Sequence, residues 1–133
     1  MSNTQRARAE IAAQIQAYRD LVGAASKASG MSLTRIDAAL SAFEPAFFNN
    51  LLVALDARFA DRTIVAGPSA ELHVLAASLL ANGGTLRMRV DVPYDADESV
   101  LRIEPGERIA LNADDFEALC AAFLAAVESA AKR

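Results

Sequence analysis

The last third of the chain holds the pattern that most constrains its fold. Apolar and polar residues alternate over residues 99–104 and again over residues 108–111, as they do in strands that bury one face. Pro105 and Gly106 lie between these segments and are typical of a tight turn. The sequence here predicts an antiparallel β-hairpin.

The alternation also sets the expected register of this hairpin. Directly opposed residues of an antiparallel pair point to the same face. We therefore expect Ile103 to lie opposite Ile109, and Leu101 opposite Leu111. The loop should have an odd length, because a two-residue loop would place Ile103 against the charged Arg108.

A C-terminal helix should follow the hairpin. Asn112 can cap it by accepting a hydrogen bond from the amide of Asp115. One apolar stripe recurs at helical spacing: Phe116, Leu119, Cys120, Phe123 and Val127. The other flank is rich in alanine, which favours a helix and would also permit close contact with a second helix, within or between chains.

The first half of the chain predicts three helices. The first covers residues 4–27, and its apolar residues follow the 3.5-residue repeat of a two-helix seam: Ile11, Ile15, Tyr18 and Val22. The seam can pack on a helix of its own chain or on a second copy. Two more helices are expected over residues 32–44 and 45–59. Pro45 separates them, because proline removes an amide donor and disfavours helical geometry in the preceding residue.

These segments together predict an α+β fold class. Residues 70–81 predict a further helix, and residues 85–92 alternate strictly, as a strand would. The expected order is three N-terminal helices, a further helix, a small antiparallel three-stranded sheet and a C-terminal helix. Residues 63–66 are a candidate fourth strand. We expect one domain over residues 1–133, with residues 1–30 as a helical segment that can serve dimerisation.

Composition bears on location and partners. The net charge is −4, which disfavours nucleic-acid binding, because that binding depends on clustered Lys and Arg. The chain has one cysteine, no apolar leader at its start and no run of roughly 20 apolar residues. We expect a cytoplasmic protein that does not enter a membrane. Its excess of arginine over lysine and its abundant alanine suggest a bacterial source.

The sequence shows no catalytic or metal-binding constellation. His73 is the only histidine and has no carboxylate or thiol three or four residues away, which excludes a helical metal-binding pair. Cys120 lies on an apolar stripe, where a thiol acts as a small hydrophobic group. Only a tertiary contact could pair these two residues. The acidic loop of residues 91–98 lacks the spacing of a calcium loop. We expect no catalytic residue, no metal and no cofactor.

One group of side chains is a candidate site for an anion. Four arginines would share the outer face of the predicted sheet: Arg87, Arg89, Arg102 and Arg108. Guanidinium groups so placed can bind a carboxylate through two hydrogen bonds. Tyr94 on the following loop and Ser69 at the start of a predicted helix complete this candidate set. Cross-strand ion pairs would explain the same arginines without a ligand.

These observations favour a non-enzymatic interaction protein, such as an adaptor, an assembly chaperone or a regulatory subunit, that forms a homodimer through its helices. The expected interface is the seam of Ile11, Ile15, Tyr18 and Val22. The alternative is a binding domain for a small anionic ligand, or an enzyme, whose site is assembled around the arginine-bearing sheet face. An antitoxin or immunity protein is a third class that the acidic charge permits.

Overall fold

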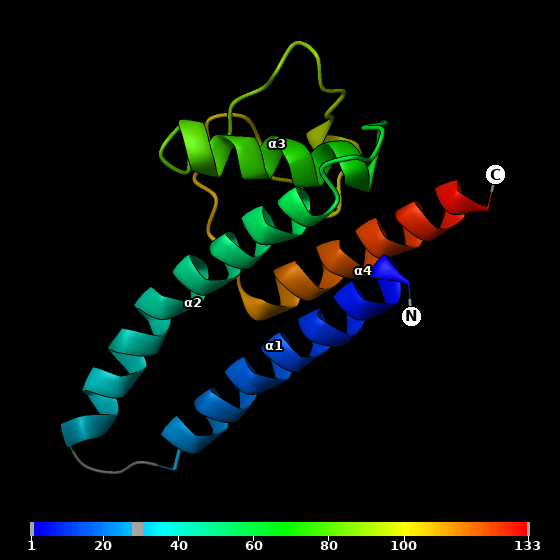
Figure 1. Ribbon diagram of the computed structural model, residues 1–133. Coiled ribbons are helices and arrows are strands. Elements are labelled where there is room, and N and C mark those ends of the chain that lie inside the picture. Colours follow the sequence, from blue (N-terminus) through cyan, green and yellow to red (C-terminus); the bar gives the residue numbers. More distant parts are fainter. Residues whose placement is uncertain (1, 28–30, 133) are drawn as a thin grey trace.

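The computed structural model describes residues 2–27 and 31–132, so the last three residues of the predicted 1–30 segment lie outside the described part. The described chain forms four α-helices, α1 (Asn3–Ala25), α2 (Met31–Arg58), α3 (Pro68–Ala81) and α4 (Ala113–Ala131), and a short 3₁₀ helix, η1 (Ala96–Glu98). Figure 1 shows α1, α2 and α4 packed side by side, with α3 across α2 and α4. The long α3–α4 connection, residues 82–112, passes over the outer side of α3.

The core lies where α2, α3 and α4 meet. Its largest fully buried side chains include Phe48, Leu52, Leu72, Leu75, Phe116 and Phe123. The ring of Phe48 lies 5.4 Å from that of Phe116, and Phe59 meets Phe123 edge to face at the same centroid distance. Burying one such side chain stabilises the fold by about 1.5–3 kcal/mol. This cluster fixes the positions of the three helices without a disulfide.

The predicted α+β class is wrong. In the described residues there is no β-strand or sheet, and the only pairing is an isolated antiparallel bridge between Thr85 and Arg108. Residues 63–66 form no strand. The expected strand over residues 85–92 does not alternate in burial, because the side chains at its centre are exposed. The fold is an all-helical bundle with extended connections.

The exposed centre of residues 85–92 explains why no sheet forms there. Leu86 and Val92 are buried, as the pattern requires, but Met88 is 47% exposed and Val90 is fully exposed. A strand that buries only its two end residues gains too little apolar contact to hold a sheet face. The segment instead forms a loop that projects beyond α3 (Figure 1).

The predicted hairpin register is also wrong, although its turn is present. The turn over residues 104–107 is closed by a backbone hydrogen bond of 3.0 Å. The amide of Ile109, however, donates to the carbonyl of Gly84 at 2.7 Å. The carbonyl of Ile103 accepts a hydrogen bond from the hydroxyl of Tyr94. Ile103 and Ile109 are therefore not hydrogen-bonded to each other.

Helix side chains replace the missing strand partners. Asn49 of α2 donates to the carbonyl of Ile109 at 3.0 Å and accepts from the amide of Leu111 at 3.2 Å. Glu71 of α3 is buried, and its two carboxylate oxygens accept from the amides of residues 100 and 101 at 2.8 and 2.9 Å. Buried backbone polar groups need such partners. The backbone amides of Leu101 and Leu111 thus donate to side chains of two different helices, α3 and α2. The two residues do not pair with each other.

The two helices expected on either side of Pro45 are one continuous helix, α2. Proline leaves the carbonyl of Ser41 without its helical donor, but Ser41 is exposed, so water can bond to that carbonyl. Buried residues after Pro45, Phe48 and Leu52 among them, stabilise this part of the helix by packing. The expected helix break therefore does not occur.

The C-terminal helix is confirmed, including its cap. The side chain of Asn112 accepts from the amide of Asp115 at 2.7 Å, and the carboxylate of Asp115 accepts from the amide of Asn112 at 3.4 Å. Helices α1 and α3 also lie where the apolar spacing predicts them. Ser69 is not the cap of α3, because the helix begins at Pro68 and Gly67 precedes it.

Candidate functional site

The predicted α1 seam packs mainly inside its own chain. Ile11, Ile15 and Tyr18 are buried, whereas Val22 is 38% exposed. Ile11 and Ile15 line a small cleft between α1 and α4 together with Cys120. A seam already covered by its own chain cannot bind a second copy along its length. Of the four predicted interface residues, only Val22 presents a substantial free surface.

Beyond this seam, α1 and α2 extend past the start of α4. Arg19 of α1 pairs with Asp114 at 3.1 Å and with Glu117 at 3.3 Å, both in the first part of α4. On the other side, Glu44 of α2 accepts from the amide of Ala113 at 3.1 Å. These contacts place the start of α4 beside Arg19 and Glu44. Among the described residues, no third helix therefore covers the part of α1 after residue 19 or the part of α2 before residue 44, as Figure 1 shows.

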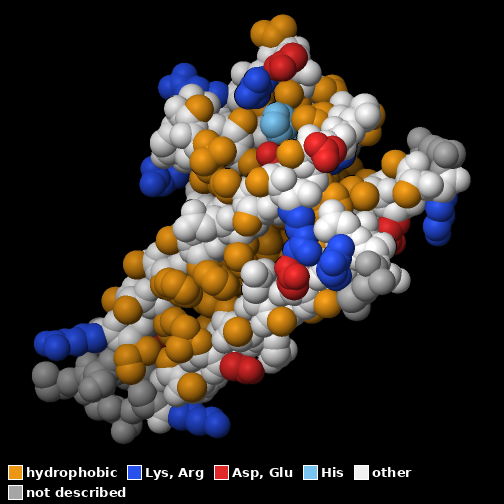
Figure 2. Space-filling view, in the orientation of Figure 1, with side chains coloured by type: hydrophobic (Ala, Val, Ile, Leu, Met, Phe, Trp, Pro, Cys, Tyr) orange, Lys and Arg blue, Asp and Glu red, His pale blue; other side chains and the backbone are white. Residues whose placement is uncertain are grey.

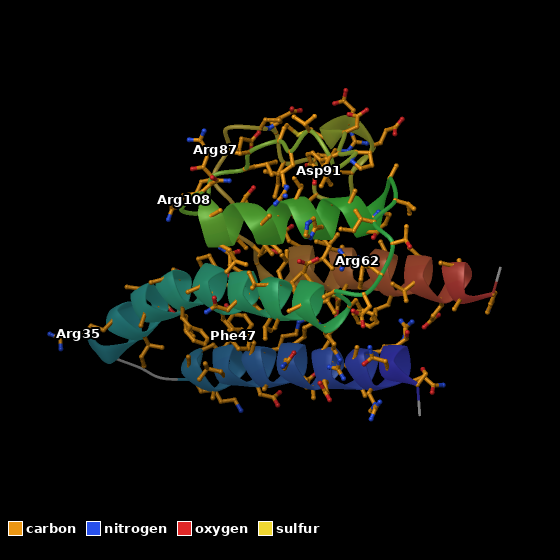
Figure 3. All side chains as sticks on the ribbon, turned by 45° about the horizontal axis from the view of Figure 1, so that its top comes forward. Arg35, Phe47, Arg62, Arg87, Asp91 and Arg108 are labelled. Carbon is orange, nitrogen blue, oxygen red and sulfur yellow. The ribbon has the colours of Figure 1, made fainter. Side chains whose placement is uncertain are left out.

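Aromatic rings fill the space between these two helix ends. The ring of Phe43 stacks on that of Phe47 with a centroid distance of 5.2 Å, and Tyr18 lies 6.4 Å from Phe43 and 6.2 Å from Phe47. Figure 3 shows Phe47 between α1 and α2. Phe43 is 43% exposed, although it is part of the stack. Burial raises the pKa of Tyr18, and the nearby Glu44 acts in the same direction.

Further apolar side chains extend this surface. Leu21 is 48% exposed and lies beside Val22 at the end of α1. We call this surface the aromatic end; it consists of Tyr18, Leu21, Val22, Phe43 and Phe47. Figure 2 shows apolar side chains gathered in the hollow between these ends of α1 and α2. Sequence reasoning missed Leu21 and Phe43 as exposed residues, because the sequence does not reveal that the start of α4 lies beside Arg19 and Glu44. It also missed Phe47, which is partly buried between them and the core.

A cluster of charged side chains links α2 to α3 through hydrogen bonds and ion pairs. The guanidinium of Arg62 donates to the carboxylate of Asp56 at 2.8 Å, and to the carbonyl and hydroxyl oxygens of Ser69 at 2.9 Å each. It also lies 4.9 Å from the ring centroid of Phe123. Arg62 thus satisfies polar groups on both sides of the α2–α3 connection. Ser69 was expected to bind an anion, but its hydroxyl and carbonyl oxygens instead accept hydrogen bonds from Arg62 of the same chain.

His73 joins this cluster through Asp56. Its Nδ1 lies 3.2 and 3.3 Å from the two carboxylate oxygens, and its side chain is 28% exposed. A carboxylate can orient a histidine for acid–base chemistry. Here the neighbouring hydroxyl of Ser69 is bonded to Arg62, and His73 is not in the lining of any of the five cavities described here. The pair therefore fits a structural role better than catalysis.

The largest of the five cavities described here, about 460 Å³, lies between the start of α3 and the α3–α4 connection. Tyr94 lines it together with three carboxylates, those of Glu71, Asp95 and Glu98. Burial raises the pKa of Glu71, and the two backbone amides that it accepts from lower it by a smaller amount. Burial also raises the pKa of Tyr94. Tyr94, expected to bind an anion, lies among groups that repel one.

The four candidate arginines do not share a face, because the sheet that would align them is absent. Arg89 forms an ion pair with Asp91 at 3.4 Å. Arg102 is exposed on another segment, with a φ of 54°. Arg87 and Arg108 alone lie together, at the C-terminal end of α3 (Figure 3). The four-arginine site is thus reduced to this pair.

Cys120 and the acidic groups provide no further site. Cys120 is buried, and burial raises the pKa of its thiol to about 12, with a smaller contribution from Glu117. It lies on α4 beside α1, whereas His73 contacts Asp56. Within residues 2–27 and 31–132, no three His, Cys, Asp or Glu side chains are grouped as metal ligands would be.

Helix α2 has an unusually exposed apolar surface. By length and composition alone, Arg35–Arg58 is apolar enough to span a membrane, with a mean hydropathy of 1.3, yet only 17% of that window is buried. Core helices of soluble proteins can have the same composition. Glu44 and Asn49, inside this stretch, bond to the backbone of residues 109–113. In the folded chain α2 is therefore part of the bundle, with much of its apolar surface uncovered.

No protein family, curated protein or solved structure matches the chain significantly.

Proposed function

We propose that this is a non-enzymatic interaction protein that forms a homodimer through the aromatic end. The observation that carries the proposal is the exposure of Leu21, Val22 and Phe43 around a ring stack, where α1 and α2 extend past α4. Single exposed apolar residues are ordinary, but a contiguous group of them marks an interaction surface. Aromatic residues are enriched at such surfaces.

Charges at the rim of the aromatic end support a second copy as the partner. A two-fold interface must be complementary to itself. The rim offers both signs, since Arg35, Asp37 and Asp20 are all exposed. Antiparallel pairing would let Arg35 of one copy face an aspartate of the other. Exposed alanines on this part of α2, Ala38 and Ala42, would allow the helices to approach closely.

The expected affinity follows from the area available. Leu21, Val22 and Phe43 are each roughly half exposed. Burying those halves in two copies would contribute about 4–9 kcal/mol, at about 1.5–3 kcal/mol for each complete side chain. Association itself costs several kcal/mol. At the upper end this leaves about 4–5 kcal/mol, so we expect a weak, reversible dimer with a Kd of roughly 0.2–1 mM, rather than a permanent one.

Size-exclusion chromatography with light scattering, at a loading concentration of about 1 mM, can locate the interface. Leu21→Ser/Phe43→Ser should shift the protein towards the monomer, because both residues are exposed parts of the aromatic end. The matched control, Val65→Ser/Met88→Ser, also replaces two exposed apolar residues but lies outside the aromatic end and should leave the mass unchanged. Ile11 and Ile15 are unsuitable, because charges at these buried positions would unfold the chain.

Three results would contradict the proposal. A folded Leu21→Ser/Phe43→Ser variant, checked by circular dichroism, could remain dimeric. The control could dissociate equally. Wild type could also float with vesicles of phosphatidylcholine and phosphatidylglycerol in a manner that depends on Leu21 and Phe43, which would assign the aromatic end to a lipid surface. Leu21→Ser alone provides a milder variant if the double change unfolds the protein.

A further inference from the structure

A second candidate surface is a groove between α2 and α3. Its volume is about 290 Å³, and its walls include α2, the C-terminal turn of α3 and residues 108–109. The walls are mostly apolar: Ala46, Val53, Leu79, Leu80 and Ile109. Leu80 is 75% exposed, although its helix packs on the core. The groove can therefore accept an apolar side chain from outside the protein.

One arginine lines this groove, and a second lies near it at the same end of α3. Arg108 is part of its lining. The bridge between Thr85 and Arg108 places residues 85, 87 and 108 on the same side of a short ladder. The backbone at Arg87 is held by Ser78, whose hydroxyl accepts from the Arg87 amide at 3.1 Å. Figure 3 shows both arginine side chains projecting from the same end of α3.

The charge of this groove is opposite to that of the chain. Arg87 and Arg108 are exposed, and neither forms an ion pair within the described residues. Arg108 is the one charged residue in the groove lining described here. Glu107, the nearest acid in sequence, turns back to accept from the amide of Glu104 at 3.3 Å. Positive charge therefore remains uncompensated beside apolar walls, in a chain of net charge −4.

We propose that the groove at Arg87 and Arg108 binds an acidic peptide segment of a partner protein. Carboxylates of the segment bind the two guanidiniums, which favour this geometry, and a neighbouring aliphatic side chain packs on Leu80. The groove is smaller than most small-molecule sites, which measure about 300–1,000 Å³, and suits one or two side chains. Two arginines are too few to neutralise a nucleic-acid backbone. This binding is independent of the aromatic end.

Fluorescence anisotropy with defined peptides tests the proposal. The probe is a short fluorescein-labelled peptide of alternating Glu and Leu, compared with its Lys and Leu counterpart. We expect the Glu peptide to bind preferentially, and more weakly as salt is added. Arg87→Glu/Arg108→Glu should lower its affinity by about tenfold or more. The control Arg6→Glu changes an exposed arginine on α1, outside both the groove lining and the aromatic end, and should alter affinity less than about twofold.

Two further variants separate this surface from others. Leu80→Ser should weaken binding of the Glu peptide by about threefold to tenfold, because an apolar contact is lost. Leu21→Ser/Phe43→Ser should bind the peptide as wild type does, even where it has lost the dimer. The proposal fails if the Glu peptide does not bind, if the Lys peptide binds equally, or if Arg6→Glu weakens binding as strongly as the double variant. Tighter binding of a labelled single-stranded oligonucleotide would also overturn it.

Discussion

Two polar side chains determine the path of the α3–α4 connection. Asn49 bonds to both a carbonyl and an amide of the segment before α4, and Glu71 bonds to two consecutive amides near η1. Both act as a neighbouring strand would, but from helices. A buried backbone group left without a partner costs about 1–3 kcal/mol. These residues should therefore have large effects on stability although neither is part of the apolar core.

Asn49→Ala should lower the free energy of unfolding by about 1–3 kcal/mol, because it leaves the carbonyl of Ile109 and the amide of Leu111 without partners. Urea denaturation measures this difference. The neighbouring Asn50 is exposed, so Asn50→Ala should change stability by less than about 0.5 kcal/mol. Equal effects of the two variants would show that the side-chain bonds of Asn49 do not hold the connection.

Glu71 should make stability depend on pH. Because burial raises its pKa, the folded protein binds its proton more tightly than the unfolded chain does. The contribution of Glu71 to stability is then greatest at acidic pH and falls as pH rises through the folded-state pKa. Glu71→Gln removes this titration, so its stability relative to wild type should increase from pH 4 towards pH 7, as measured by urea denaturation. Glu98→Gln, an exposed carboxylate at the same cavity, is the control. A constant difference between Glu71→Gln and wild type across this range would refute the prediction.

Cys120 should be inert in the folded protein. With a pKa of about 12, only about one thiol in 10⁴ is ionised at pH 8, and the thiolate is the reactive form. We expect negligible labelling by a disulfide reagent such as Ellman's reagent in buffer, and complete labelling in strong denaturant. Fast labelling of the folded protein would mean that the cleft between α1 and α4 opens readily.

At the scale of elements, helices were predictable and the pairing of extended segments was not. Apolar spacing located α1, α3 and α4, and the capping residue Asn112 located the start of α4, because these signals act within one segment. Alternation over residues 108–111 correctly indicated that Ile109 and Leu111 are buried. It could not reveal that their backbone partner is a helix side chain. Which group becomes the hydrogen-bond partner of this backbone depends on contacts between residues that are far apart in the sequence.

Pro45 provides a test at the same scale, because sequence rules expected it to end a helix. In α2 it costs one backbone hydrogen bond without breaking the helix. Pro45→Ala would restore the amide donor for Ser41, and Ala is favoured over Pro by about 3 kcal/mol in a helix interior. The greater freedom of the unfolded chain offsets part of this gain. We expect thermal or urea denaturation to show a net stabilisation of about 1–2 kcal/mol. A less stable variant would indicate that the proline ring itself contributes packing.

For the whole molecule, the predicted interface seam is largely buried within its own chain, so the surface that we propose for self-association lies at other residues. The seam of α1 is real, yet α2 and α4 cover Ile11 and Ile15. The aromatic end becomes apparent only when the position of α4 is known, through its contacts with Arg19 and Glu44. The same holds for the pairing of His73 with Asp56, which lie seventeen positions apart. The spacing of apolar residues along a helix predicts which residues of that helix share a face. It does not predict contacts between different helices, such as these.

Sedimentation equilibrium of the wild-type protein tests the central claim, self-association, most directly. The chain has a mass of 14.1 kDa. Between about 20 µM and 1 mM, the range in which a Kd of roughly 0.2–1 mM produces a transition, the average mass should rise from that of one chain towards that of two. Moderate salt should change this little, because the proposed contacts are mainly apolar. A single species of 14.1 kDa at every concentration would contradict the account.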